Sequence, residues 1–314
     1  MPFMKPNEEF ITIDDNLNKI SDFINDMIIS PRKNAHKWSE LTNQTPNLKM
    51  GYPGQHLASL IVGMKGTATG ARGDDIVDGT EVKSCSKVDQ SDKCNNCKTT
   101  VLRSDKICPK CGSSDIKRNN DSKWLIGIRN ENELRMALDE TPRFLFVVTD
   151  YPDFDNKNFE DIRIRAFEVW VKSERCKNFR ELLKSYYFNI YLEHIKLDEK
   201  HTPAPKNIFP DGFPFYMCNP IKTFECTILN SLSSKPEIKI SKYIQPSIDR
   251  EDIESEKMPA SLLNKKELKI LKIDPKNISN SYVNENNRNI LSLRDTDKNN
   301  VPKDAHIRAY LFEN

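Results

Sequence analysis

Two side chains that lie two residues apart offer the clearest chemistry in this sequence. Glu81 and Lys83 belong to the segment Glu-Val-Lys-Ser, and alternate residues of a β-strand point to the same face of a sheet. Together with the upstream carboxylates of Asp74 and Asp75, this face would bind a hard divalent cation such as Mg²⁺. Such a cation activates water and absorbs charge on a phosphate, and a lysine can position or deprotonate that water. The segment therefore predicts metal-dependent phosphodiester hydrolysis, although an isolated Glu-Val-Lys is usually just part of an exposed strand.

The aspartate that joins this site depends on the turn that precedes the strand. A hairpin is expected over residues 74–88, because the Asp-Gly pair at 78–79 is a favoured two-residue turn. A two-residue turn places Asp74 opposite Lys83, whereas a loop longer by one residue places Asp75 there instead. The residues alone leave both alternatives open.

The same segment resembles a known family of nucleases. It reads Gly-Asp-Asp-Ile-Val-Asp from Gly73, and Glu-Val-Lys-Ser follows after a turn. This order is similar to the PD-(D/E)XK nucleases, and especially to type II restriction endonucleases of the Pvu kind. Those enzymes carry Gly-Asn-Asp-Ala-Val-Asp, a longer turn and Glu-Leu-Lys-Ser. The resemblance, which runs from Gly54 to Ser84, implies that Asp75 and Glu81 bind Mg²⁺ and that the lysine two residues further on is catalytic.

The resemblance also implies a fold, a substrate and rival functions. The expected fold is α/β (α+β), a restriction-endonuclease-like mixed sheet flanked by helices. The expected activity is Mg²⁺-dependent, sequence-specific cleavage of double-stranded DNA by a homodimer. Possible DNA contacts are Gln55 or His56 on the upstream helix, and Arg129 and Asn130, which suit guanine and adenine. The alternatives are a repair, resolvase or nicking nuclease of the same fold, or a non-catalytic zinc-ribbon DNA-binding protein.

Four clustered cysteines predict a second, structural metal site. Cys94 and Cys97 form one Cys-x2-Cys pair, and Cys108 and Cys111 form another ten residues later. Two such pairs supply four thiolates for tetrahedral Zn²⁺, and a site closed by four sulfurs is structural. The basic residues around them either meet phosphates or form a solvated face: Lys87, Lys93, Lys98, Arg103, Lys106, Lys110, Lys117 and Arg118. The remaining cysteines are expected to be small buried hydrophobes: Cys85, Cys176, Cys218 and Cys226.

The elements that must hold these residues follow from apolar periodicity. The expected helices are 14–29 (ended by Pro31), 54–64, 131–139, 179–195 and one near 259–271. The expected strands are 124–128, 144–149, 162–171, 236–244 and 306–312. Together with the resemblance, these elements imply a nuclease core over 1–90 and 120–200, an inserted zinc ribbon over 91–119, and a C-terminal extension over 201–314 for DNA binding or dimerisation.

Composition sets broader limits on function. The 314 residues are 37% hydrophobic and 30% charged, which suffices for a folded core. The formal net charge is only +2, so bulk charge gives little support for nucleic-acid binding. The sequence shows no signal peptide, no membrane-spanning run and no GxxxxGK[ST] phosphate loop. We therefore expect a soluble cytoplasmic protein that uses no nucleotide cofactor.

Overall fold

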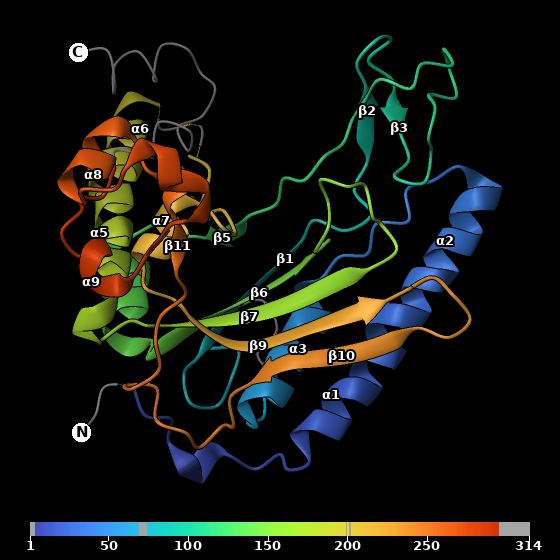
Figure 1. Cartoon of the computed structure of the whole chain (residues 1–314). Coiled ribbons are helices and arrows are strands. Elements are labelled where there is room, and N and C mark those ends of the chain that lie inside the picture. The colour runs from blue at the N-terminus through green and yellow to red at the C-terminus, as the bar shows by residue number, and fades with distance from the viewer. Residues whose placement is uncertain (1–3, 69–73, 199, 201, 295–314) are drawn as a thin grey trace.

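The centre of the molecule is a five-stranded mixed sheet (Figure 1). The computed structural model describes residues 4–68, 74–198, 200 and 202–294. The sheet strands are β1 (Glu81–Ser86), β6 (Arg143–Asp150), β7 (Ile162–Trp170), β9 (Ile221–Leu229) and β10 (Glu237–Tyr243). They lie in the order β1-β6-β7-β9-β10. β1 runs parallel to β6, and the other neighbours are antiparallel, which confirms the predicted mixed sheet.

β6 lies inside the sheet because its apolar run is buried on both faces. All eight of its residues are buried. Leu145 and Val147 pack into the core on one face, and Phe144 and Phe146 pack into the core on the other. A strand covered on both sides reads as a continuous hydrophobic run, so the prediction of a doubly buried strand at 144–149 is confirmed.

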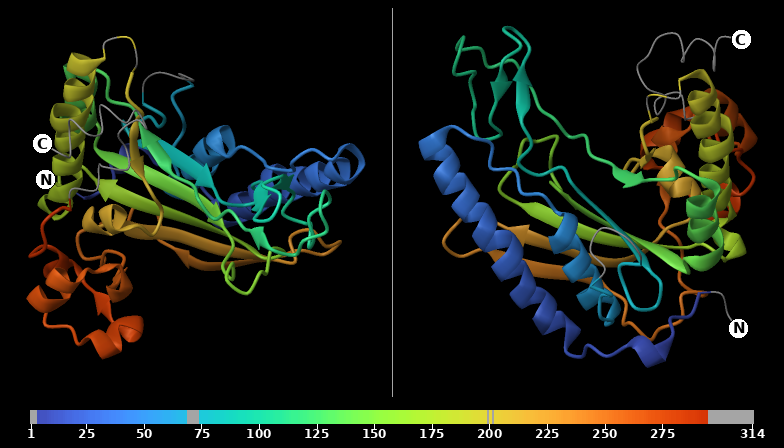
Figure 2. Two further views of the ribbon diagram at one scale, coloured as in Figure 1. Left: turned by 90° about the horizontal axis from the view of Figure 1, so that it is seen from above. Right: turned by 180° about the vertical axis from the view of Figure 1, so that it is seen from behind.

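The N-terminal helices cover the first face (Figures 1 and 2). They are α1 (Asn16–Ile24), α2 (Ser30–Thr42) and α3 (Gly51–Val62), and a π-helical turn over Asn25–Ile29 joins the first two. The expectation that Pro31 ends the first helix is wrong. Pro31 lies in the first turn of α2, where a residue without an N–H is tolerated because the preceding π-helical turn has already changed the bonding pattern.

The second face carries the remaining helices, which gather at one end of the sheet (Figure 1). The helices are α4 (Glu131–Arg135), α5 (Lys177–Ser185), α6 (Leu192–Leu197), α7 (Phe213–Met217), α8 (Lys265–Ile270) and α9 (Glu285–Arg288). Short π-helical turns extend α4 over Met136–Glu140 and join α5 to α6 over Tyr186–Tyr191. Single 3-10 turns occur at Glu8–Phe10, Glu174–Cys176, Ala260–Leu262 and Pro275–Asn280. The helices expected at 131–139 and 179–195 are therefore confirmed.

Three small sheets complete the described part of the chain. β5 (Trp124–Ile126) pairs with β8 (Lys206–Ile208), and β11 (Met258–Pro259) pairs with β12 (Tyr282–Val283). β2 (Asp92–Cys94), β3 (Thr100–Val101) and β4 (Ile116–Lys117) form a three-stranded sheet in the order β3-β2-β4. This sheet belongs to the cysteine-bearing module over 91–119, which projects near α2 at the end of the molecule opposite the cluster of helices that contains α5 to α9 (Figure 1; Figure 2, right).

The five-stranded sheet draws on both sides of the boundary that the sequence suggested near residue 200. β9 and β10 come from beyond it and pair with β7 and with each other. The division into a nuclease core and a C-terminal extension for DNA binding or dimerisation remains a prediction, and the five-stranded sheet spans that division. The strand expected at 306–312 lies outside the described residues. Within the described residues, no helix is both long and apolar enough to cross a membrane.

Candidate active site

Strand β1 places Glu81 and Lys83 on one face of the sheet edge. Glu81 lies beside Phe144 and Lys83 beside Phe146 in the parallel ladder with β6, while the intervening Val82 is buried against the opposite face. Lys83 Nζ forms an ion pair with Glu81 Oε1. Both side chains line a cleft of about 700 Å³, together with Asp74. The strand alternation that predicted a shared face is thus realised in the structure.

The hairpin expected over residues 74–88 does not form. The segment before β1 contributes one isolated bridge, between Gly66 and Ile76, and then a tight turn in which the Gly79 N–H donates to the Ile76 carbonyl (2.9 Å). The physical reason is a competition for partners: β1 pairs with the buried β6, and the Val82 N–H donates to the carboxylate of Asp75 (2.7 Å). The Asp-Gly turn is present, but residues 74–80, which the structure describes, form no strand that pairs with β1.

Asp75 is held between β1 and α3 by bonds to both of its carboxylate oxygens. Oδ2 accepts the Val82 N–H, and Oδ1 accepts Gln55 Nε2 at 2.6 Å. α3 can approach β1 this closely because residue 54 is glycine: a β-carbon there would lie 2.4 Å from Cβ of Ser84. Ser84 Oγ also donates to the carbonyl of Met50 (2.6 Å), which fixes the start of the helix beside the strand.

Burial gives the carboxyl groups unusual acidities. It raises the pKa of Asp75 and of Glu81 above their ordinary values; the nearby carboxylates raise both further, and Lys83 opposes the shift. Asp74, which is exposed, contributes to the repulsion that both of these groups experience. Desolvated carboxylates gathered in this way are stabilised in their charged form by a cation. Carboxylate oxygens suit a hard metal ion, and both aspartates raise the pKa of Glu81, but these oxygens do not converge as closely as the sulfurs of the four clustered cysteines.

The candidate DNA contacts divide into two groups. Arg129 and Asn130 line the same cleft as Glu81. In this structure the Arg129 guanidinium is bonded to Glu133 (Nη2 to Oε1, 2.7 Å), and Asn130 caps α4 by accepting the Glu133 N–H. Gln55 bonds to Asp75, as described above. His56 is exposed, with its ring 6.2 Å from that of Phe23, and it is absent from the cleft lining.

The sequence patterns did not predict the position of Arg143 near the site. Arg143, the first residue of β6, is fully buried and bonds to Thr80 and Asp78 in the turn before β1. The available signal was a single arginine at the start of an otherwise apolar run, where a charge is costly unless it is paired.

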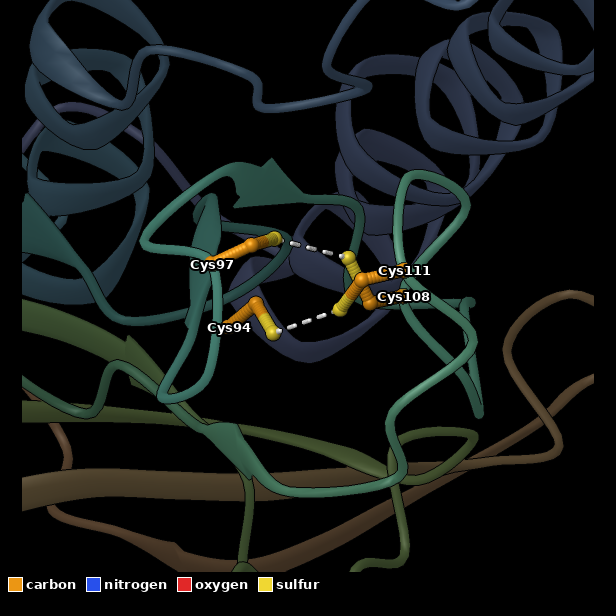
Figure 3. A group of neighbouring side chains, drawn as sticks. All are labelled: Cys94, Cys97, Cys108 and Cys111. Atoms are coloured by element: carbon orange, nitrogen blue, oxygen red, sulfur yellow. Dashed lines mark hydrogen bonds between the residues drawn. The ribbon is translucent and has the colours of Figure 1, made fainter.

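The four clustered cysteines form the second site (Figure 3). Their Sγ atoms all lie within 4.8 Å of one another, with Cys94 and Cys111 at 3.7 Å and Cys97 and Cys108 at 3.5 Å. Tetrahedral Zn²⁺ with Zn–S bonds of about 2.3 Å separates its sulfurs by roughly 3.8 Å, so the donor set fits that ion. In the described part of the chain, no other set of three or more potential ligands is drawn together this closely.

The other cysteines are buried, and two basic residues of the module form ion pairs within the protein. The four scattered cysteines are buried, as expected. Arg103 and Arg118 both pair with the buried Asp92 (3.1 and 2.7 Å), and the Arg103 guanidinium lies 4.8 Å from the ring of Phe159 in the loop before β7. The two ion pairs therefore lie within the module, and the contact with Phe159 joins the module to the loop before β7. The exposed basic residues that remain free of these contacts are Lys93, Lys98, Lys106, Lys110 and Lys117.

Comparison with known proteins identifies a family. Residues 37–261 match the model of the MamI restriction endonuclease family. The type II restriction enzyme MamI of Microbacterium ammoniaphilum is 37% identical to the chain over 57 residues, which are 18% of this chain and 18% of that enzyme. The chain thus aligns with less than a fifth of that relative's length, and no solved structure matches the chain significantly. Because the family model spans well over half of the sequence, the chain belongs to the MamI restriction endonuclease family.

Proposed function

We propose that this protein is a type II restriction endonuclease that hydrolyses double-stranded DNA at a specific sequence with Mg²⁺. One observation carries the proposal: Glu81, Lys83 and Asp74 line a single cleft beside Asp75, in a chain that belongs to a restriction endonuclease family. The order of these residues supports assignment to the PD-(D/E)XK branch. The mixed sheet flanked by helices is compatible with that fold.

Each residue of the cleft has a role in this proposal. The carboxylates of Asp75 and Glu81 hold Mg²⁺, and Asp74 is the alternative or additional ligand. When bound, the cation lowers the pKa of water and offsets negative charge on the scissile phosphate. Lys83, which pairs with Glu81 in this structure, would orient the attacking water and stabilise charge on the phosphate. Gln55 holds the Asp75 carboxylate beside β1 through its bond to Oδ1.

We assign recognition of the DNA sequence to two other residues that line the cleft. Arg129 and Asn130 lie where the β5 strand gives way to α4. An arginine pairs with the edge of guanine and an asparagine with that of adenine. A palindromic target would be read by a homodimer, because two-fold protein symmetry mirrors the symmetry of the site. The cysteine-bearing module contributes structural Zn²⁺ and presents its exposed lysines to phosphates.

The test compares the proposed catalytic pair with a matched pair elsewhere on the sheet. Glu81→Gln and Lys83→Met should each lower Mg²⁺-dependent plasmid cleavage by about 100-fold or more, while DNA binding without metal is retained. Glu225→Gln and Lys222→Met remove a similarly exposed ion pair on β9, with 21% and 20% of the side chains exposed against 24% and 25% at the site. These control variants should cleave like the wild type.

The fragment pattern decides between the rival functions. Discrete double-strand fragments support a restriction enzyme, whereas nicks or site-independent products indicate another nuclease of the same fold. Wild-type protein that cuts no DNA in Mg²⁺ or Mn²⁺ contradicts the proposal and favours a non-catalytic DNA-binding protein. Full cleavage by both Glu81→Gln and Lys83→Met would move the active site elsewhere.

A further inference from the structure

A buried arginine lies directly beneath the turn that precedes the catalytic strand. Arg143 has no exposed surface and begins β6, one residue before the partner of Glu81 in the parallel ladder. Its Nε donates to Thr80 Oγ1 (2.8 Å), and its Nη2 donates to Asp78 Oδ2 (3.0 Å). A single guanidinium group therefore holds two side chains of the same turn.

That turn also determines where the candidate metal ligand Asp75 lies. The Asp75 N–H donates to the carbonyl of Thr80 (3.2 Å), and the Thr80 N–H donates to Asp78 Oδ1 (3.0 Å). The Gly79 N–H closes the turn on the Ile76 carbonyl. Because Arg143 is bonded to the side chains of positions 78 and 80, it fixes the segment to which the Asp75 backbone is hydrogen-bonded.

The Arg143 guanidinium is itself fixed in place by buried residues of β7. Its Nη1 lies 3.4 Å from Oε1 of Glu168 on β7, which is also fully buried, and its guanidinium lies 5.0 Å from the Trp170 ring. Arg250 pairs with the same Glu168 (3.3 Å). A buried charge is costly unless it is paired and hydrogen-bonded, and an apolar residue would have continued the β6 run at no such cost. We therefore attribute the arginine at position 143 to the bonds that it makes with the turn.

We propose that Arg143 is a positioning residue for the metal site, which holds the turn over residues 75–80 so that the aspartate carboxylates face Glu81. The inference rests on the proposed function, because it concerns the same Mg²⁺ site. Arg143 touches neither the cation nor DNA and acts through Thr80 and Asp78. Partners that orient metal ligands typically contribute 10- to 100-fold to metal affinity.

The experiment separates this role from general stability with paired variants. Arg143→Lys keeps the positive charge, but a single ammonium group cannot reproduce the planar fork that reaches Thr80, Asp78 and Glu168 together. It should raise the Mg²⁺ concentration for half-maximal cleavage about 10-fold or more, with metal-free DNA binding unchanged. Arg250→Lys weakens the same buried Glu168 pair without touching the turn, and it should leave the Mg²⁺ requirement at the wild-type value.

Thr80 provides a second route if Arg143→Lys fails to fold. Thr80→Val keeps the shape but removes the hydroxyl that accepts from Arg143, and it should shift the Mg²⁺ requirement in the same direction. Thr80→Ser restores the hydroxyl and should recover the wild-type requirement. Titration of the zinc-loaded proteins with Mn²⁺ alone, with Glu81→Ala as background, measures metal affinity without any cleavage.

The outcomes distinguish this inference from the proposed function. Weaker Mn²⁺ binding and a higher Mg²⁺ requirement in Arg143→Lys and Thr80→Val, but not in Arg250→Lys, support the positioning role. A wild-type protein that cleaves DNA while folded Arg143→Lys or Thr80→Val keeps the wild-type Mg²⁺ requirement overturns the inference and leaves the nuclease intact. A wild type that neither cleaves DNA nor binds Mn²⁺ above the Glu81→Ala background overturns the proposed function, and the inference falls with it.

Discussion

A single methyl group added at Gly54 should push α3 away from the sheet and disturb the active site through Gln55. A β-carbon at position 54 would lie 2.4 Å from Cβ and 2.6 Å from Oγ of Ser84. Non-bonded carbon atoms approach to about 3.5 Å, so the helix would have to move by about 1 Å. The same movement would lengthen the 2.6 Å bond from Gln55 to Asp75 to about 3.6 Å, which is too long for a hydrogen bond.

The energetic cost follows from two opposing effects. Overpacking a well-packed contact typically costs about 1–3 kcal/mol. Alanine in a helix recovers about 0.5–1 kcal/mol relative to glycine, so the expected net loss in the free energy of unfolding is about 1–2 kcal/mol. Because Asp75 loses the donor on one carboxylate oxygen, the Mg²⁺ concentration for half-maximal cleavage should also rise, by about 10-fold.

The assay uses a matched glycine in the same helix. Gly51 begins α3 and has no atom within 4 Å of the position that a β-carbon would occupy, so Gly51→Ala should be neutral or slightly stabilising in urea denaturation. Replacing Ser84 with glycine removes both clashing atoms, and the nearest remaining atom, its Cα, would lie at 3.9 Å. In that background Gly54→Ala should cost no more than Gly51→Ala. Equal stability of the two single variants, or a cost at position 54 that persists after Ser84→Gly, would refute the reasoning.

Three further predictions concern zinc, acid stability and base recognition. Atomic emission should detect one equivalent of zinc in the purified wild type and in Cys226→Ala, but none in Cys97→Ser; a zinc-free wild type would contradict the structural site. Asp89 is buried, and although burial disfavours its charged form, bonds from His36 and Arg32 hold its pKa well below the usual range. The stabilising contribution of the Asp89 carboxylate should therefore be complete above about pH 4 and lost as the pH falls further. Asp89→Asn should lower the free energy of unfolding by about 3–5 kcal/mol in urea denaturation at neutral pH and should make that free energy less dependent on pH in acid. An acid dependence equal to that of the wild type would contradict this role of Asp89. Arg129→Ala should reduce the discrimination between the correct and the wrong base pair at one position by about 1–3 kcal/mol. Cleavage of target sites that carry single base substitutions measures this discrimination. Unchanged specificity would show that Arg129 does not contact a base.

Local patterns in the sequence were sufficient to predict which side chains lie together at the two candidate sites. Glu81 and Lys83 share a face because side chains alternate along any strand, whatever its partner. The two Cys-x2-Cys pairs bring four sulfurs within 4.8 Å of one another, because each pair is close in sequence and the intervening loop is short. The buried faces of α1 and α3 and the doubly buried β6 likewise follow from periodicity within one segment.

The tertiary structure decided which distant groups meet. β1 could have paired with the segment before it, and the Asp-Gly turn favours that hairpin locally. It pairs instead with β6, more than 50 residues away, because β6 is buried on both faces and must be flanked by strands. The carboxylate of Asp75 then takes the Val82 N–H, so a side chain replaces the expected neighbouring strand. Neither outcome can be read from a local window, because each depends on a competition between partners far apart in the chain.

The supporting residues of the active site show the same division. Gln55 had the chemistry for a DNA contact, yet the close approach of α3 at Gly54 directs it to Asp75. Arg143 looked like the polar start of a strand, yet it is buried beneath the turn that it holds. The sequence by itself determined which functional groups this protein carries and which neighbours share a face. Only the tertiary structure decided how they are oriented, because hydrogen bonds and buried charges are satisfied by whichever groups the packing of helices and strands brings within reach.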